Sequence, residues 1–263
     1  MKLSLFSTFH AFGVALSVLA LGASEGRCQA TTEKLTTAKE VLARYVEVTG
    51  GVEKYKEIKG IVQEGTMSLA LAGIEGKMQV KYAGKDRLLV NVDLGGVGTE
   101  SSGVFNGTGW SDSTMTGTRL ITGKELEQLQ SQTEMQQYYD PESVYQEMEL
   151  EGETEVKGQA CYSLKLTRKS GRVERDFYSV ETGLKLKSQI TADTPAGSFE
   201  IDVFYDEYAD FSGLKQPSVV TQKLPNGMDM VLKTTKFEIN PKLDDSVFEL
   251  PEKIKKMVEK QSK

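Results

Sequence analysis

The chain has 263 residues, with 32 lysines and arginines against 38 aspartates and glutamates, and a formal net charge of −6. This acidic balance argues against binding to nucleic acid or to an anionic membrane surface. The only histidine is His10, so the rest of the chain has no side chain for Ser-His-Asp catalysis, Cys-His catalysis or an HExxH zinc site.

Residues 1–30 have the pattern of a signal peptide. Lys2 provides a basic start, and the apolar run Ala11–Leu21 follows. That run is too short to span a bilayer, which takes about 20 residues. Small residues at Cys28 and Ala30 suit cleavage before the next residue. We therefore predict export to the periplasm and a soluble protein after cleavage.

The mature chain is expected to be one domain, residues 31–263. Cleavage removes Lys2, Arg27 and Glu25 and leaves a net charge of about −7. Arg27 directly before Cys28 argues against lipid attachment at that cysteine. Cys161 is then the only cysteine left, so no intramolecular disulfide is possible, and we interpret it as a structural residue.

The first elements of the mature chain are predicted to be helical. Apolar residues recur at helical spacing within residues 31–50: Leu35, Ala38, Leu42, Tyr45 and Val46. The pair Gly50-Gly51 is typical of a helix end, and a shorter helical piece follows over 52–58.

From Gly60 the apolar residues alternate with a period of two, which indicates antiparallel strands with one apolar face. Glycines separate the runs, as in a meander. Asn106-Gly107 is a favoured hairpin turn and leads into a strand that contains Trp110.

The stretch GTRLITGKE, residues 117–125, superficially resembles a phosphate-binding loop. Five residues instead of four separate its glycine from Gly-Lys, and Glu125 at the next position would repel a phosphate. We instead predict a loop or short extended segment over Gly117–Ile121. A helix over 122–139 follows, capped by Thr122 with Glu125 as its capping-box partner.

After Pro141 the strand pattern resumes and continues to Asn240. Alternation places Ile201 and Val203 on one face of their strand and Asp202 and Asp206 on the other. A short helical turn and a basic amphipathic helix are predicted at the C-terminal end. The fold class is thus mainly β, with about eleven strands and helices at both ends and in the middle of the chain.

The order of these elements and several short motifs resemble the bacterial outer-membrane lipoprotein-sorting proteins, the LolA/LolB-like family, in a poorly characterised branch. The motifs are a helix ending in TGG, then GVFNGTGW, GTRLITGKELEQL, DFYSVETGLKLK and the closing FELPE. The resemblance covers essentially all of residues 31–263.

The resemblance implies a strongly curved antiparallel sheet, an unclosed barrel, with helices over its concave face and the 122–139 helix as a lid or flank. It also implies a non-enzymatic carrier that binds acyl chains of lipids or lipoproteins in an apolar hollow. Inner- and outer-membrane donor and acceptor proteins would be its partners. We expect no cofactor, no metal and no nucleic acid, and a monomer.

The candidate ligand-binding residues are those that alternation places on the apolar face of the strands, together with Trp110. They are Met67, Leu69, Leu71, Met78, Val80, Tyr82, Leu88, Val90, Val92, Trp110, Phe199, Ile201, Val203, Met228 and Met230. The methionines suit an irregular lipid, because their side chains adapt to the space available.

Two other hypotheses remain open. In the first, the same side chains are only core residues beneath the helices, in a sensing or scaffold domain that binds a partner protein without lipid. A hydrolase with paired carboxylates, such as Asp202 and Asp206, is disfavoured by the missing histidine and by their expected place on a solvated face.

Overall fold

The structure is a computed structural model that describes residues 34–195 and 197–261. The predicted signal peptide, residues 1–30, lies outside the described residues. Five α-helices occur in the described part: α1 (Ala38–Thr49), α2 (Val52–Glu57), α3 (Gly123–Ser131), α4 (Pro141–Val144) and α5 (Glu252–Gln261). Four short 3₁₀ segments accompany them: η1 (Ala70–Ala72), η2 (Gly95–Val97), η3 (Met135–Tyr138) and η4 (Asp245–Phe248).

Thirteen strands form a single antiparallel sheet in the described chain. They are β1 (Ile61–Leu69), β2 (Ile74–Tyr82), β3 (Arg87–Asp93), β4 (Thr99–Phe105), β5 (Thr108–Ser113), β6 (Gly117–Ile121), β7 (Tyr145–Val156), β8 (Gln159–Arg168), β9 (Val173–Ser179), β10 (Lys185–Thr194), β11 (Gly197–Phe211), β12 (Leu214–Lys223) and β13 (Asp229–Ile239). The mainly β class and the unclosed curved sheet predicted from the sequence are confirmed, with thirteen strands in place of about eleven.

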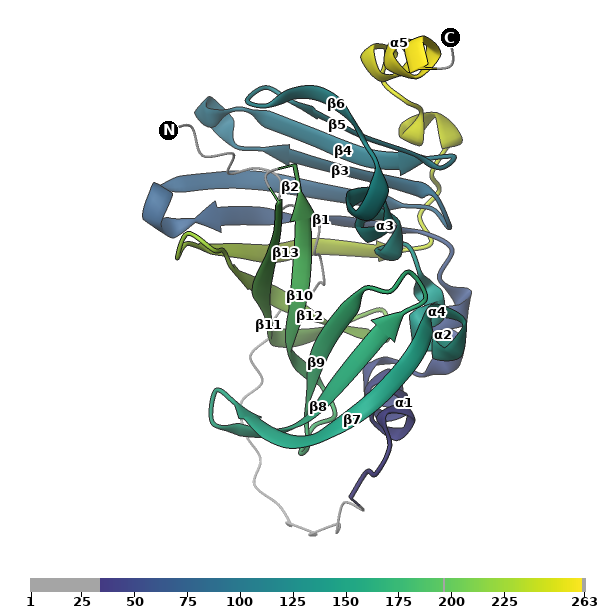
Figure 1. The fold of residues 1–263 in the computed structure, drawn as a ribbon, viewed down its shortest axis with the longest axis vertical. Helices are drawn as coiled ribbons and strands as arrows, with labels where there is room; N and C mark the ends of the chain where they lie inside the picture. Colours follow the sequence, from purple (N-terminus) through teal and green to yellow (C-terminus); the bar gives the residue numbers. More distant parts are fainter. Residues whose placement is uncertain (1–33, 196, 262–263) are drawn as a thin grey trace.

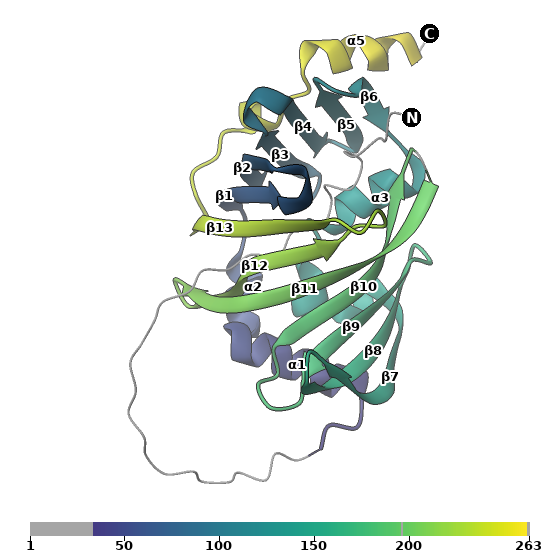
Figure 2. The same ribbon diagram turned by 90° about the vertical axis from the view of Figure 1, so that its left-hand side faces the viewer.

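The strand order places the start of the sheet at its centre. It runs β6-β5-β4-β3-β2-β1-β13-β12-β11-β10-β9-β8-β7. The chain therefore moves outward from β1 to the edge strand β6, crosses to the opposite edge at β7, and returns strand by strand until β13 pairs with β1. Figures 1 and 2 show the resulting sheet curving around its concave side, with β6 and β7 far apart.

Bulges help the sheet to curve. Register shifts occur in β1 between Glu64 and Gly65, and in β10 between Lys185 and Lys187. A bulge bends its strand and increases the local twist. Gly65 also allows a close approach of β13, because a Cβ there would lie 2.2 Å from the carbonyl oxygen of Lys233.

The crossing from β6 to β7 is made by residues 122–144, which we call the cover segment. It contains α3, η3 and α4. Helix α3 contacts both β4 and β10, strands that are far apart in the sheet order, so it lies inside the curve (Figures 1 and 2). The cover segment therefore lies at the lid or flank position that the resemblance implies for residues 122–139.

The cover segment is less helical than the sequence predicts. The continuous helix expected over 122–139 ends at Ser131, and η3 follows after a turn. The hydroxyl of Thr133 donates a hydrogen bond to the carbonyl of Gln130, at 2.8 Å. Such local side-chain bonds compete with the helical ladder.

Two other local expectations can be compared with the structure. Of the two alternatives for Gly117–Ile121, the short extended segment is correct, because these residues form strand β6, with Trp110 of β5 opposite Leu120. Thr122 is the N-cap of α3 but makes no side-chain capping bond, because Glu125 instead accepts two hydrogen bonds from Arg119. A capping box does occur at α1, between Thr37 and Glu40.

Several predicted turns and ends are confirmed. Asn106 and Gly107 both have positive φ, at 49° and 79°, as a type I′ hairpin requires. Gly50 ends α1 at φ 144°, a conformation that favours glycine. The predicted C-terminal turn and helix are η4 and α5, and α5 packs beside β6 (Figure 1).

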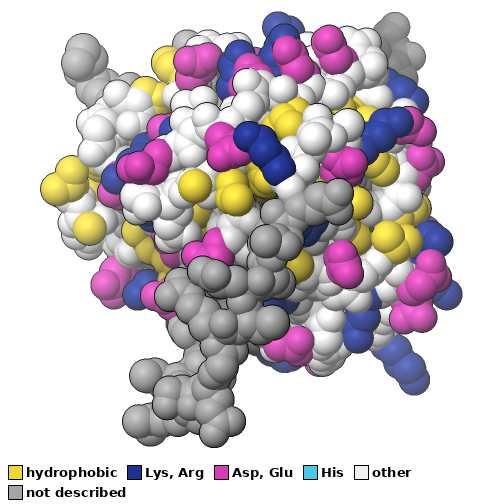
Figure 3. Space-filling view, turned by 90° about the horizontal axis from the view of Figure 1, so that it is seen from below, with side chains coloured by type: hydrophobic (Ala, Val, Ile, Leu, Met, Phe, Trp, Pro, Cys, Tyr) yellow, Lys and Arg dark blue, Asp and Glu magenta, His cyan; other side chains and the backbone are white. Residues whose placement is uncertain are grey.

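The surface carries both signs of charge. On the face in Figure 3, basic and acidic side chains alternate with hydrophobic ones, and no single kind forms a continuous field. Many of these charges are paired, for example Lys157 with Asp206 at 2.9 Å and Lys34 with Glu153 at 2.7 Å. None of the helices within the described residues is long and apolar enough to cross a membrane.

Candidate functional site

Most of the candidate residues lie together on the concave face, which we call the apolar wall. Each of the following is at most 8% exposed and belongs to one core cluster: Met67, Leu69, Met78, Val80, Tyr82, Leu88, Val90, Val92, Ile201, Val203 and Met230. Met228 is partly buried and packs against the same cluster.

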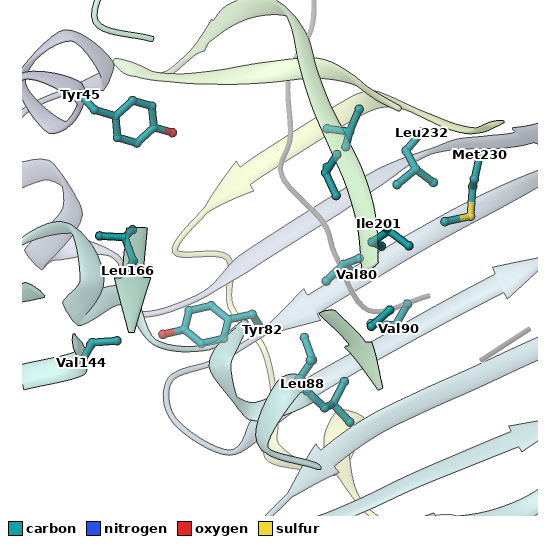
Figure 4. Close-up of a cluster of buried hydrophobic side chains, with 14 of the residues drawn as sticks. Tyr45, Val80, Tyr82, Leu88, Val90, Val144, Leu166, Ile201, Met230 and Leu232 are labelled. Carbon is teal, nitrogen blue, oxygen red and sulfur yellow. The ribbon is translucent and has the colours of Figure 1, made fainter. Parts of the chain in front are cut away.

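The register of the strands explains how these residues meet. Met67 of β1 lies opposite Leu232 of β13, and Val80 of β2 lies opposite Val90 of β3. Curvature then brings β11 over the same surface. Figure 4 shows Ile201 grouped with side chains from β2, β3 and β13, including Val80, Val90 and Met230.

Three candidate residues lie outside the apolar wall: Leu71, Phe199 and Trp110. Leu71 is in η1, the turn between β1 and β2, and is 79% exposed, because the alternation predicted through this position stops at the turn. Phe199 is 37% exposed, close to the turn between β10 and β11.

Trp110 is buried but faces the outer side of the sheet. A Cβ at its neighbour Gly109 would meet Leu126 of α3, so Gly109 faces the concave side and Trp110 faces away. Asp112, on the same face as Trp110, pairs with Lys253 of α5 at 3.3 Å. The tryptophan therefore belongs to the layer beneath the C-terminal helix and does not line the concave side.

A cavity of about 140 Å³ opens at the edge of the apolar wall. Val80, Tyr82 and Leu88 contribute to it from the sheet, and Tyr55 and Tyr138 contribute from α2 and η3. Its remaining lining residues are Ile58, Ile61, Gln63, Gln132, Met135, Gln137, Leu214, Gln216 and Phe237. An apolar cavity of about 150 Å³ accommodates a benzene molecule, so this space is far smaller than an acyl chain.

The concave face of β8–β11 is different, because charged and tyrosine side chains lie there beside the aliphatic ones. Lys185 pairs with Asp176 at 2.8 Å, and Asp176 also accepts hydrogen bonds from the hydroxyls of Tyr178 and Ser188. The lysine Nζ also lies 5.5 Å from the ring centroid of Tyr205. Burial opposes the charge of Lys185, but the carboxylate of Asp176 and the surrounding tyrosines together raise the pKa of the lysine.

We call Lys185, Asp176 and Ser188, together with the tyrosines that surround Lys185, the tyrosine cluster. These tyrosines are Tyr45, Tyr138, Tyr178 and Tyr205. Its helical members come from α1 and η3. Tyr45 makes an edge contact with Tyr178, with ring centroids 5.3 Å apart, and Tyr138 stacks on Tyr55 of α2 at 4.4 Å. Burial raises the pKa of Tyr45 and of Tyr178. The cluster joins α1 and the cover segment to the sheet.

A second polar group joins the cover segment to β8. Arg168 donates a hydrogen bond to Glu134 at 2.7 Å and another to Gln137 at 3.2 Å. It also pairs with Glu174 of β9, which accepts a hydrogen bond from Tyr145 at 2.9 Å. Burial disfavours the arginine charge, but Glu174 and its neighbours raise the pKa of Arg168.

The sequence gives no direct indication of these two polar groups. Asp176, Lys185 and Arg168 occur in charged stretches that are typical of a solvated face, and their partners are far away in the sequence. Cys161, by contrast, is buried as expected of a structural residue, beside Val156 and Phe177 on the outer face. No group of histidines, cysteines or carboxylates within the described residues is arranged to hold a metal ion.

Comparison with known proteins identifies the fold. A scan against protein-family models gave no match, and a search of curated proteins gave none either. Among solved structures, the fold is similar to a DUF1329 family protein from Desulfovibrio piger, with a TM-score of 0.54 and 18% identity. The match covers 82% of this chain and 98% of that one.

Two further structures are similar over nearly their whole length. One is a LolA superfamily protein from Nitrosomonas europaea, with a TM-score of 0.53 and 14% identity over 82% of this chain and 99% of that one. The other is a candidate outer membrane lipoprotein-sorting protein domain from Vibrio parahaemolyticus, with a TM-score of 0.51 and 13% identity over 80% and 97%. The resemblance predicted from the sequence is thus confirmed at the level of the fold.

Proposed function

We propose that this protein is a non-enzymatic periplasmic carrier that holds an acyl chain of a lipid or lipoprotein against the apolar wall. The observation that carries the proposal is the wall itself: aliphatic and methionine side chains from five strands form one continuous surface inside the sheet. Such contacts are non-directional, so the surface accepts chains of different shape. The name of one similar structure, a lipoprotein-sorting protein domain, supports the same role.

Binding requires the wall to open. A cavity of about 140 Å³ cannot accept an acyl chain. Each buried CH₂ contributes about 0.8 kcal/mol, so a long chain supplies on the order of 10 kcal/mol toward opening. A membrane offers the chain a similar gain. Transfer therefore runs between nearly matched apolar sites, and the opening sets the rate.

The cover segment is the part that moves in this proposal. It contains short helical pieces, and polar side-chain bonds tie it to the strands and their turns. Besides the bonds of Arg168, Glu125 accepts two hydrogen bonds from Arg119 of β6. The side-chain oxygen of Gln128 accepts a hydrogen bond from the backbone of Asp193 at 2.9 Å, and Gln130 donates one to Asp86 at 2.9 Å. Bonds of this kind contribute roughly 1 kcal/mol each, within reach of the energy of acyl burial.

Location and partners follow from the same proposal. The signal-peptide pattern of residues 1–30 directs the chain to the periplasm, where donor and acceptor proteins in the two membranes would deliver and receive the cargo. The acidic net charge makes nucleic acid an unsuitable partner. A monomer suffices, because one chain supplies both the wall and its cover.

The experiment is to express the whole sequence in a Gram-negative host, purify the exported protein without detergent, and weigh it by native mass spectrometry. A stoichiometric lipid that leaves on denaturation supports the carrier. The matched variants are Val80→Phe, which places a phenyl ring on the wall, and Lys81→Phe, which places the same ring on the opposite face. We expect only the first to reduce lipid occupancy. A protein that is empty and takes up no lipid when mixed with vesicles contradicts the proposal and favours the partner-binding scaffold.

A further inference from the structure

The concave face changes character at β4. In β2 and β3 its residues are apolar, whereas in β4, β5 and β6 polar residues join the core residues Val104 and Ile121. The polar residues are Glu100, Ser102, Ser111, Ser113 and Arg119. Across the β3–β4 boundary Val92 lies opposite Glu100, and Val90 lies opposite Ser102. The polar end therefore begins one strand spacing, about 4.8 Å, from the apolar wall.

Glu100 is the unusual member of this end. The residue is only 6% exposed, and its Oε2 atom is buried with no hydrogen-bond partner among the described residues. The side chain is on the concave face, because it shares that face of β4 with Val104, a member of the main core. Buried carboxylate oxygens almost always have a partner. An unfilled acceptor next to an apolar wall therefore indicates a missing donor.

The charges around Glu100 define the kind of donor. Arg119 gives two hydrogen bonds, of 2.7 and 2.5 Å, to Glu125 of α3, so those two residues neutralise each other. Ionised Glu100 then leaves one uncompensated negative charge at this end. Burial is the main cause that raises the pKa of Glu100 to about 7, with Arg119 opposing the shift and Glu125 adding to it. A cationic donor suits this site, and a carboxylate or phosphate does not.

We propose that Glu100 accepts a hydrogen bond from the ammonium group of an amphiphile whose alkyl chain lies along the apolar wall. The adjacent Ser102 and Ser111 add neutral hydroxyls beside the head group, both only 2% exposed. This inference rests on the carrier function proposed above and specifies the polar end of the ligand. It predicts that the protein selects its cargo by head group as well as by tail.

The test uses three probes with the same tail: dodecylamine, dodecanol and dodecanoate. Each is titrated below its micelle concentration into lipid-free protein made from the whole sequence, with affinity measured by calorimetry. We expect the amine to bind about tenfold more tightly than the alcohol, with the carboxylate weakest, since a hydrogen bond between two charged groups is stronger than one from a neutral hydroxyl. Glu100→Gln should remove the preference for the amine. Asp112→Asn, which removes a carboxylate from the opposite face, should keep it.

A second readout needs no variant. The pKa of Glu100, followed by NMR of its carboxyl carbon, should fall when the amine binds and should not fall with the alcohol. Equal affinities for the three probes, or a preference for the amine that survives Glu100→Gln, overturns this inference and leaves the carrier function standing. Failure of every probe to bind overturns both.

Discussion

Two regions of the same concave face are built by opposite means. The apolar wall of β1–β3, β11 and β13 is held by aliphatic and methionine contacts, whereas the tyrosine cluster on β9–β11 is held by a buried ion pair and directed hydrogen bonds. Apolar contacts have no preferred direction, so the wall can rearrange around a guest. A satisfied polar network is lost if any member moves. The concave face therefore has a fixed half and an adaptable half.

The largest expected effect is in the fixed half. Asp176→Ala leaves the Lys185 ammonium buried without its carboxylate, which typically reduces the free energy of unfolding by about 3–5 kcal/mol. Urea unfolding followed by circular dichroism measures the change. Asp202→Asn removes the more exposed partner of Lys187 and should change stability by less than about 1 kcal/mol. If the two substitutions reduce stability equally, the buried Asp176–Lys185 pair does not hold this half of the concave face in place.

In the adaptable half, shape should matter less than volume. Met67 is fully buried, so Met67→Ala is expected to reduce the free energy of unfolding by about 3 kcal/mol through the cavity it leaves. Met67→Leu conserves volume and should lose less than about 1.5 kcal/mol. Both values come from urea unfolding of lipid-free protein. If leucine is as damaging as alanine, the wall requires exact shapes and is not adaptable.

At the polar end of the concave face, stability should depend on pH in one direction. The pKa of Glu100 is raised to about 7 in the folded protein from an ordinary value of 4.5, so ionisation in the folded state opposes folding. The penalty is absent below pH 4.5, grows up to about pH 7 and then stays constant. Glu100→Gln should therefore stabilise the protein by about 2–3 kcal/mol at pH 8 and by nothing at pH 4. Thermal unfolding at the two pH values measures this, and a gain that does not change with pH would contradict the burial of an ionisable Glu100.

The smallest effect on stability is expected where the cover segment is bonded to β8. Glu134 is partly exposed in its pair with Arg168, so Glu134→Gln should change global stability by only about 0.5 kcal/mol. Because this bond ties the cover segment to β8, amide hydrogens of residues 123–139 should exchange several times faster than in the wild type. Hydrogen exchange read by mass spectrometry measures this. Faster exchange throughout the sheet would indicate general destabilisation and no specific role for the bond.

The sequence predicts the adaptable half better than the fixed half. The alternation of Met78, Val80 and Tyr82 has one interpretation, because a strand with one apolar face buries that face. The turn at Asn106-Gly107 is predicted for a similarly local reason, since both residues tolerate positive φ. Local patterns fix both features, so a single sequence is sufficient for them.

The tyrosine cluster could not be predicted in this way. Lys185 and Asp176 look like surface residues, and they become interior residues only because β9 and β10 curve beneath α1 and the cover segment. The sequence places Trp110 in a strand after the Asn106-Gly107 hairpin turn, which does not determine the face of the sheet on which it lies. Whether Trp110 faces the concave side depends on which face of the sheet α3 covers and which face α5 covers. The path of the cover segment from β6 to β7 determines this, and it is not visible in the local sequence.

The most direct test of the account maps where an alkyl chain lies. An alkyl amine with a photoreactive diazirine on its tail is bound to the lipid-free protein, irradiated, and the labelled residues are identified by peptide mass spectrometry. The account predicts labels on the apolar wall, at residues such as Met67, Met78 and Val90, and loss of labelling in Val80→Phe. Labels confined to the outer face around Trp110, or labelling that Val80→Phe leaves unchanged, would contradict it.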